Sequence, residues 1–180
     1  MTTPHTEPRE LLTPRQFIIL SIATFGLYDL WWIFKSWRFF RDREQSSIHS
    51  AMRTMFSVFY LIPLLKRIRA FAAETGYSTR FSPWGIYLAT FLLNFPSVLP
   101  EPLSYLSVFS CLPLLPALNA LNFAILQTEG DQAVVQTSYN RRQRLLLIAG
   151  GFVWLVGILA VIGQLMMAAA PTEALPPYQG

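Results

Sequence analysis

The run of residues from Phe17 to Phe40 constrains the fold of this chain most strongly. It begins with residues compatible with hydrocarbon and ends in a belt of aromatic and basic residues. Its first 18 residues, Phe17–Phe34, would extend roughly 27 Å as a helix, just enough for the hydrocarbon core of a bilayer. Because Tyr and Trp prefer the headgroup level, the aromatic belt predicts a transmembrane helix over residues 17–37 that ends at one face of the membrane.

A cleaved signal peptide is the alternative for the same run. Its apolar part is long enough, but no A-x-A-like cleavage site follows it, and an aromatic belt is foreign to a cleavage region. Two basic residues, Arg9 and Arg15, precede the apolar part of the run, and four basic residues follow Phe34 within ten residues. We therefore interpret the run as a retained helix whose C-terminal end lies in the cytoplasm.

The composition supports a membrane protein. Of the 180 residues, 53% are hydrophobic and only 13% are charged, whereas a soluble domain averages about 25% charged residues. The apolar excess lies in long blocks, so we expect one all-α membrane domain over residues 16–170, an integral membrane helical bundle. The predicted transmembrane helices cover residues 17–37, 83–100, 103–126 and 145–168. We expect disordered tails over residues 1–15 and 171–180.

The segment Ala51–Ala73 does not fit a simple span. Its uncharged core, Thr54–Leu65, has only 12 residues, roughly 18 Å as a helix, and Pro63 interrupts it. Basic residues lie at both ends of this core. After Pro63, apolar residues share one helical face that basic residues flank, which is typical of a helix lying in the membrane interface. We therefore predict a re-entrant or interfacial helical hairpin over residues 51–73 on the cytoplasmic side.

The basic residues also predict how the chain crosses the membrane, which we expect to be the inner membrane of the cell. With Lys35–Arg80 and Gln127–Arg144 in the cytoplasm, 12 of the 14 basic residues are inside. A rival arrangement, with residues 51–73 as a fifth span and the N-terminus inside, places five of the 14 outside. The positive-inside rule favours the first arrangement, with four spans and both termini outside the cytoplasm.

Proline and small polar residues predict where helices begin and bend. Thr13-Pro14 and Ser82-Pro83 each combine a good N-cap residue with proline at the first helical position. Pro113 and Pro116 predict that the segment 103–126 is kinked or split.

Asp29 is the only acidic residue inside a predicted span. An intramembrane carboxylate is by default a candidate functional group, because its insertion is costly. The alternative is that Asp29 lies only about 9 Å along the helix from Lys35 and is hydrated or paired near the headgroups. Both interpretations are open at this stage.

Two asparagines are further candidates for intramembrane function. Asn119 and Asn122 are three residues apart, hence on one helical face, and they follow two prolines. They would either line a polar cavity or form hydrogen bonds with neighbouring helices and with carbonyls freed by the prolines. Asn94, beside Pro96, has the same two interpretations.

Two clusters of basic residues flank the predicted membrane segments. They would form a cytoplasmic rim that binds anionic lipid headgroups, or they would serve to set the topology alone. The residues of this predicted rim are Lys66, Arg67, Arg69, Arg141, Arg142 and Arg144.

Five residues follow helical spacing along the last span, and the small ones among them would let another helix approach closely, from this chain or from a partner. The five are Ala149, Val153, Gly157, Ala160 and Gln164.

The sequence contains no recognisable catalytic constellation. It has two histidines and a single cysteine, Cys111, and it lacks an HExxH motif, a cysteine pair, a Gly-rich phosphate loop and a G-x-S-x-G elbow. We therefore predict no catalytic residues, no metal ligands and no cofactor. The net charge of +4 does not indicate nucleic-acid binding, because the basic residues lie beside membrane segments.

One motif carries a resemblance to a known family. The stretch T-F-G-L-Y-D-L-W-W, Thr24–Trp32, resembles the T-F-G-x-Y-x-x-Y/W-W motif of a family of small bacterial multi-pass inner-membrane proteins of unknown function. Ser47–Ile68 and Leu112–Asn122 look like further segments of that family. The resemblance implies a bacterial inner-membrane protein and carries over no activity.

Three functions are compatible with these observations. The first is a non-catalytic accessory protein that binds lipid or a membrane partner, which the absence of catalytic groups favours. The second is a transporter or channel subunit that acts as a homo-oligomer, since four spans enclose little volume in one subunit. A lipid-modifying enzyme is the third, and it lacks the necessary groups.

Overall fold

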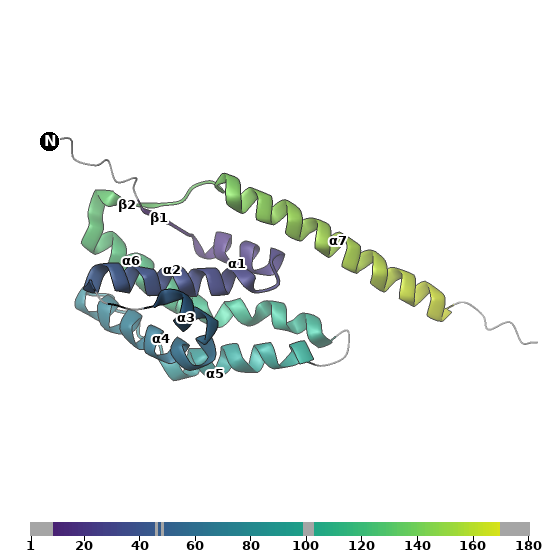
Figure 1. The fold of residues 1–180 in the computed structure, drawn as a ribbon, viewed down its shortest axis with the longest axis horizontal. Coiled ribbons are helices and arrows are strands. Elements are labelled where there is room, and N and C mark those ends of the chain that lie inside the picture. Colours follow the sequence, from purple (N-terminus) through teal and green to yellow (C-terminus); the bar gives the residue numbers. More distant parts are fainter. Residues whose placement is uncertain (1–8, 46, 48, 99–102, 170–180) are drawn as a thin grey trace, which may run out of the picture.

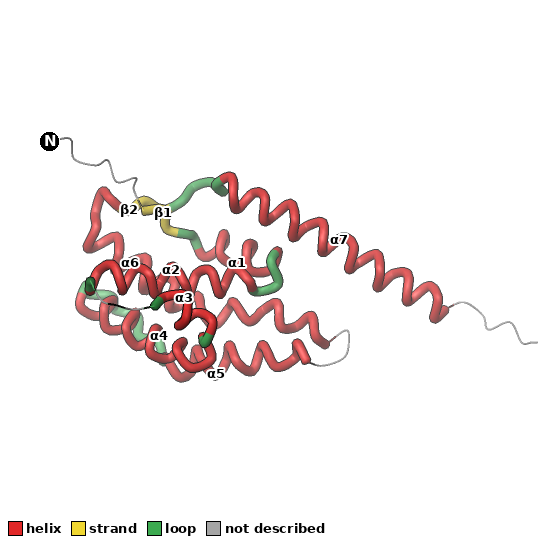
Figure 2. The backbone as a smooth tube through the Cα atoms, viewed as in Figure 1, coloured by secondary structure: helices red, strands yellow, loops and turns green. Residues whose placement is uncertain are grey.

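The computed structural model describes residues 9–45, 47, 49–98 and 103–169 (Figure 1). Within these residues the chain forms seven α-helices, three 3-10 helices and two short strands. Helix dominates the structure, and the strands are confined to one small region (Figure 2). The predicted all-α character is therefore confirmed, with a two-stranded addition that the sequence did not predict.

The predicted helix over residues 17–37 is not continuous in the structure. Helix α1, Pro14–Ala23, and helix α2, Leu27–Glu44, are separated by a three-residue turn. The ring of Phe17 at the start of α1 packs edge-on against Trp32 in α2, with centroids 5.7 Å apart. The two helices therefore form a hairpin, and α1, with 10 residues, extends only about 15 Å.

The T-F-G part of the family-like motif builds this turn. Phe25 and Gly26 both have left-handed backbone conformations, with φ of 53° and 83°. The Gly26 N–H donates to the Ser21 carbonyl at 2.8 Å, and the Thr24 hydroxyl accepts from the Tyr28 N–H at 3.0 Å. An α-helix cannot continue through two left-handed residues, which is why the run reverses direction at this turn.

Helix α1 begins as predicted. The Thr13 hydroxyl accepts from the Gln16 N–H at 3.2 Å, and the Gln16 side chain accepts from the Thr13 N–H at 3.0 Å. This reciprocal capping, with Pro14 at the first helical position, satisfies backbone donors that would otherwise lack a partner.

Two short strands join the beginning of the chain to its last third. Strand β1, Arg9–Leu11, pairs in parallel with β2, Ala133–Val135, and Arg9 forms an ion pair with Glu129 at 3.0 Å. Residues 9–11 are therefore ordered, although we predicted a disordered tail over residues 1–15; residues 1–8 and the predicted tail 171–180 lie outside the described residues. The pairing also places residues 9–11 beside the 127–144 segment, whereas the predicted threading placed them on opposite faces of the membrane.

The predicted hairpin over residues 51–73 corresponds to two helices, α3, Ser50–Met55, and α4, Ser57–Glu74. Pro63 does not interrupt α4, which continues through it. The apolar face after Pro63 is present as predicted, and its members Ile68 and Phe71 are buried. This face packs within the bundle, since α4 packs mainly against α6.

The middle of the chain forms a second, longer hairpin. Helix α5, Pro83–Asn94, continues into η1, Phe95–Val98, and the chain returns through η2, Leu103–Leu114, and α6, Leu115–Glu129. The Ser82 hydroxyl caps α5 by accepting from the Gly85 N–H at 3.2 Å. The predicted split of segment 103–126 occurs at its prolines, where the 3-10 helix gives way to α6. The 3-10 helix η3, Gly130–Gln132, leads from α6 to β2.

Helix α7, Arg141–Ala169, is the longest element and extends past the other helices (Figure 1). It contacts α1 through Gly150 and Trp154; the Trp154 indole N–H donates to the Ile22 carbonyl at 3.0 Å, and its ring stacks on Phe25 at 4.7 Å. At its start, the buried Gln143 amide donates to the Tyr28 hydroxyl at 3.2 Å. Beyond these contacts most of α7 is exposed and apolar.

The described bundle has one end rich in charge, here called the charged end. It comprises β1, β2, the last turns of α2, α4 and α6, and the first turn of α7. Cross-element contacts hold these segments together: Arg67 pairs with Glu44 at 2.5 Å, and the Arg43 guanidinium lies 4.1 Å from the centre of the Phe71 ring. Arg9 lies over Phe39 at 4.9 Å, which ties β1 to α2.

The opposite end, here called the apolar end, gathers the tips of the three hairpins. Large apolar side chains are exposed at each tip: Leu27 is 68% exposed, Phe59 is 74% exposed and Val98 is 75% exposed. A water-soluble protein rarely exposes such a contiguous apolar surface. Two helical segments, Ser104–Gln132 and Arg141–Ala168, are also long and apolar enough to cross a membrane.

Candidate functional site

A cavity lies at the apolar end, between α2, α4, α5 and η2. Its volume is about 600 Å³. Most of its wall is apolar, and the side chains that matter most for its shape are Leu30, Ile33, Leu61, Phe91 and Leu114. Concave, mostly apolar cavities with a few polar groups are the usual form of small-molecule sites.

Asp29 supplies the one charged group in this cavity wall. The residue is only 7% exposed, and its Oδ1 accepts a hydrogen bond from the Ser21 hydroxyl. Its backbone N–H donates to the Gly26 carbonyl at 3.1 Å, so the turn holds it in the first turn of α2. Within the described residues, Oδ2 accepts no hydrogen bond, which leaves one carboxyl oxygen available to a molecule in the cavity.

Further polar side chains line the same cavity, among them Thr90 and Asn94 on α5 and Ser110 on η2. The Thr90 hydroxyl is buried and has no hydrogen-bond partner among the described residues. Asn94 donates to the Thr90 carbonyl at 2.9 Å, and Ser110 is 3% exposed. A buried hydroxyl without a partner is energetically costly, so Thr90 is a second group suited to a hydrogen bond with a ligand.

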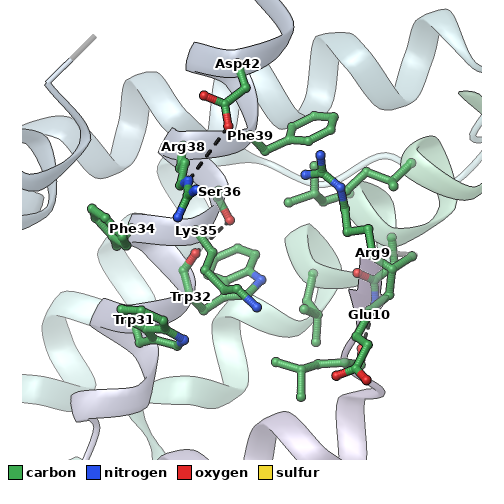
Figure 3. Close-up of a pocket in the computed structure, with 16 residues that line it drawn as sticks. Arg9, Glu10, Trp31, Trp32, Phe34, Lys35, Ser36, Arg38, Phe39 and Asp42 are labelled. Carbon is green, nitrogen blue, oxygen red and sulfur yellow. Dashed lines mark hydrogen bonds and ion pairs between the residues drawn. The ribbon is translucent and has the colours of Figure 1, made fainter. Parts of the chain in front are cut away.

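The placement of Asp29 bears on both sequence interpretations. Asp29 is buried beside a cavity, and it forms no ion pair with Lys35 among the described residues. Lys35 instead lines a different groove, on another face of α2 (Figure 3). The interpretation as a carboxylate paired with Lys35 therefore does not describe this arrangement.

The other predicted polar residues are separated by the fold. Asn122 donates to the Leu12 carbonyl at 2.8 Å and fastens α6 to the segment before α1, which is the packing role considered from sequence. Asn119 is exposed and does not line the cavity. Asn94 does line it and also binds a backbone carbonyl, so it combines both interpretations.

The predicted lipid-binding rim is distributed over two helices. Its first three members are on α4, which packs against α5, α6 and α2, and its last three are on α7, which packs against α1. Arg67 is already engaged by Glu44. Among the described residues, no hydrogen bond or ion pair joins the two clusters, which are Lys66, Arg67, Arg69 and Arg141, Arg142, Arg144.

The small-residue stripe predicted on α7 is offset from the face that packs. Ala149, Val153, Ala160 and Gln164 are exposed, and only Gly157 is partly buried. The inward face of α7 is instead formed by Gln143, Leu147, Gly150, Trp154, Gly157 and Val161. Sequence reasoning missed Gly150, because nothing in a helix of mixed small and large residues marks which glycine meets another backbone.

A second groove, of about 340 Å³, lies between β1, α2 and α6 (Figure 3). It brings Arg9 next to Lys35 and Arg38, beside the aromatic side chains of Trp31 and Trp32. No local pattern in the sequence indicates this proximity, since the strand pairing that positions Arg9 depends on residues more than a hundred positions later.

Within the described residues, no group of three or more His, Cys, Asp or Glu side chains is placed to hold a metal ion. The chain matches no protein-family model, no curated protein and no solved structure with which it was compared. The site must therefore be interpreted from its own geometry.

Proposed function

We propose that this chain is a membrane-embedded, non-catalytic protein that binds an amphipathic molecule of the lipid class in the Asp29 cavity. The observation that carries this proposal is the cavity of about 600 Å³ at the apolar end, whose mostly apolar wall holds one carboxyl group and the unpartnered Thr90 hydroxyl. A ligand with a long apolar part and one hydrogen-bond donor would satisfy these groups.

The distribution of charge supports insertion of the apolar end into the membrane. Most of the 14 basic residues lie on segments of the charged end, whereas the hairpin tips expose apolar side chains. Because basic residues favour the cytoplasmic side, the charged end with strand β1 would face the cytoplasm. In this arrangement no basic residue lies on the opposite side of the membrane, whereas the arrangement predicted from sequence alone places two there, Arg9 and Arg15.

The helix lengths support a specific membrane topology. Helix α1 extends about 15 Å and cannot cross a hydrocarbon core of roughly 30 Å, so α1 and α2 would form a re-entrant hairpin. Helix α7 has 29 residues, about 43 Å, and is long enough to cross. With α5–η1 and η2–α6 as the two arms of a crossing hairpin, the N-terminus would be cytoplasmic and the C-terminus would lie on the opposite side. The family-like motif is compatible with a bacterial inner-membrane protein of this kind.

The binding proposal is testable with an uncharged probe. A long-chain alcohol carrying a diazirine supplies an apolar chain and one donor, and irradiation would attach it to peptides from residues 83–98 of the reconstituted protein. Phe91→Trp should fill part of the cavity and lower this labelling severalfold. The matched control is Phe152→Trp on the exposed part of α7, which should leave it unchanged. Labelling of residues 83–98 that is insensitive to Phe91→Trp would refute binding in the cavity.

A homo-oligomeric transporter or channel subunit is the second candidate. It is favoured by the buried carboxyl group beside a cavity and by the long exposed surface of α7, which another copy would cover. The mass of the protein in mild detergent distinguishes the two candidates. A closed homo-oligomer without retained lipid supports the transporter, whereas a monomer that retains lipid supports the binding protein.

A further inference from the structure

The groove between β1 and α2 combines basic side chains with an aromatic wall at the boundary between the charged and apolar parts of the bundle (Figure 3). We propose that it binds the phosphate group of an anionic phospholipid from the surrounding leaflet. This groove shares no lining residue with the Asp29 cavity, so it is a separate site. The inference rests on the membrane insertion proposed above and not on the ligand of the cavity.

Two of the three basic residues of the groove already lie near carboxylates. Arg9 is paired with Glu129 at 3.0 Å. Arg38 lies 3.8 Å from Asp42, and Asp42 is held more closely by Arg41, at 2.7 Å.

Lys35 forms no ion pair among the described residues, and its side chain extends from α2 toward β1 (Figure 3). The three basic residues of the groove outnumber its two carboxylates, which belong to Glu10 and Asp42. A monoanionic phosphodiester suits this balance, because the nearby Glu10 carboxylate disfavours a more highly charged anion.

The aromatic wall indicates that the anion belongs to a lipid and is not free in solution. Trp31 is 47% exposed and stacks on Phe34, with ring centroids 5.5 Å apart. Leu27 precedes Trp31 by one helical turn and is also exposed. These residues form an apolar stripe that leads along α2 from the groove to the apolar end, which is the path an acyl chain would take.

The groove also differs from the basic clusters predicted from sequence. Lys66 is exposed on α4 and is not among the residues that line the groove. It carries the same charge as Lys35, and it therefore provides a matched control for removal of one positive charge.

The experiment is native mass spectrometry of the full-length protein in detergent, titrated with phosphatidylglycerol or phosphatidylcholine. The wild-type protein should retain phosphatidylglycerol in preference. Lys35→Gln should lower its retention about fivefold, while Lys66→Gln leaves it unchanged. Lys35→Arg keeps the charge and should restore most of the retention, which also shows that the position tolerates substitution. Thermal unfolding of each variant establishes that it is folded.

Three outcomes would overturn the proposal. Equal losses for Lys35→Gln and Lys66→Gln would indicate attraction by net charge alone. Equal retention of phosphatidylcholine would show that the groove does not select an anionic headgroup. Displacement of the lipid by millimolar inorganic phosphate would identify a site for free anions. None of these outcomes changes the result expected with the uncharged alcohol probe of the Asp29 cavity, so either proposal can be refuted without refuting the other.

Discussion

Gly150 of α7 lies directly against the backbone of Ala23 at the end of α1. A Cβ atom at position 150 would be 2.1 Å from the Ala23 carbonyl oxygen, a distance that no relaxed structure allows. Because the obstacle is backbone, it cannot move aside as a flexible side chain would. The close approach of these two residues is what allows Trp154, one turn later, to reach the Ile22 carbonyl.

Gly150→Ala should therefore destabilise the protein even though alanine is the better helix former. We expect a loss of about 1–3 kcal/mol in the free energy of unfolding, because the two helices must separate. Gly151→Ala is the matched control, since nothing lies within 4 Å of its Cβ position. Thermal unfolding in detergent measures both variants, and equal melting temperatures would contradict the contact.

Trp154→Phe removes the hydrogen bond to the Ile22 carbonyl and keeps an aromatic ring to stack on Phe25. We expect a loss of about 0.6–2 kcal/mol, the range for a hydrogen bond between helices in a membrane environment. Phe152→Leu, on the exposed face of α7, should change stability by less. If both substitutions had the same effect, the indole N–H would not contribute to docking of α7.

The turn between α1 and α2 should depend on Gly26. Its φ of 83° is unfavourable for a residue with a Cβ atom, so Gly26→Ala should cost about 1 kcal/mol or more. The Gly151→Ala variant again provides the comparison, because that glycine lies within a regular helix. A Gly26→Ala protein as stable as the wild type would mean that the left-handed turn is not retained.

Ser21→Ala should leave the Asp29 carboxyl group without its hydrogen-bond donor in a buried position. We expect a loss of about 1–3 kcal/mol, since an unsatisfied buried polar group is costly. The double variant with Asp29→Leu should recover part of this loss, because both partners are then removed. If the loss of stability in the double variant equalled the sum of the losses in the two single variants, the two side chains would not be coupled.

The proposed topology predicts that both strands lie on one side of the membrane. A reporter fused to the N-terminus and one inserted in the loop between β2 and α7 should both be active in the cytoplasm. A reporter at the C-terminus should give the opposite result. If the first two reporters lay on opposite sides of the membrane, the arrangement predicted from sequence would be supported. That result would be incompatible with pairing of Arg9 and Ala133.

The sequence by itself determined the helical class and the local boundaries that depend on neighbouring residues. Thr13 and Ser82 cap their helices as predicted, the prolines at 113 and 116 mark a change of helix type, and the last apolar run forms one long helix. These features follow from backbone hydrogen bonding within a few positions. The apolar face of α4 was also predictable from its periodicity, although what it packs against was not.

Only the tertiary structure decided the course of the chain and the surroundings of its polar groups. Hydropathy does not show where a chain reverses direction, so the run around Gly26 resembled one span. The pairing of Arg9 with residues near Ala133 depends on no pattern of neighbouring residues. Likewise, Asp29 and Lys35 lie six positions apart on one helix, yet they line different cavities because α2 packs other elements on each side. Contacts between residues distant in sequence set these relationships, and a single sequence records residue types without recording such contacts.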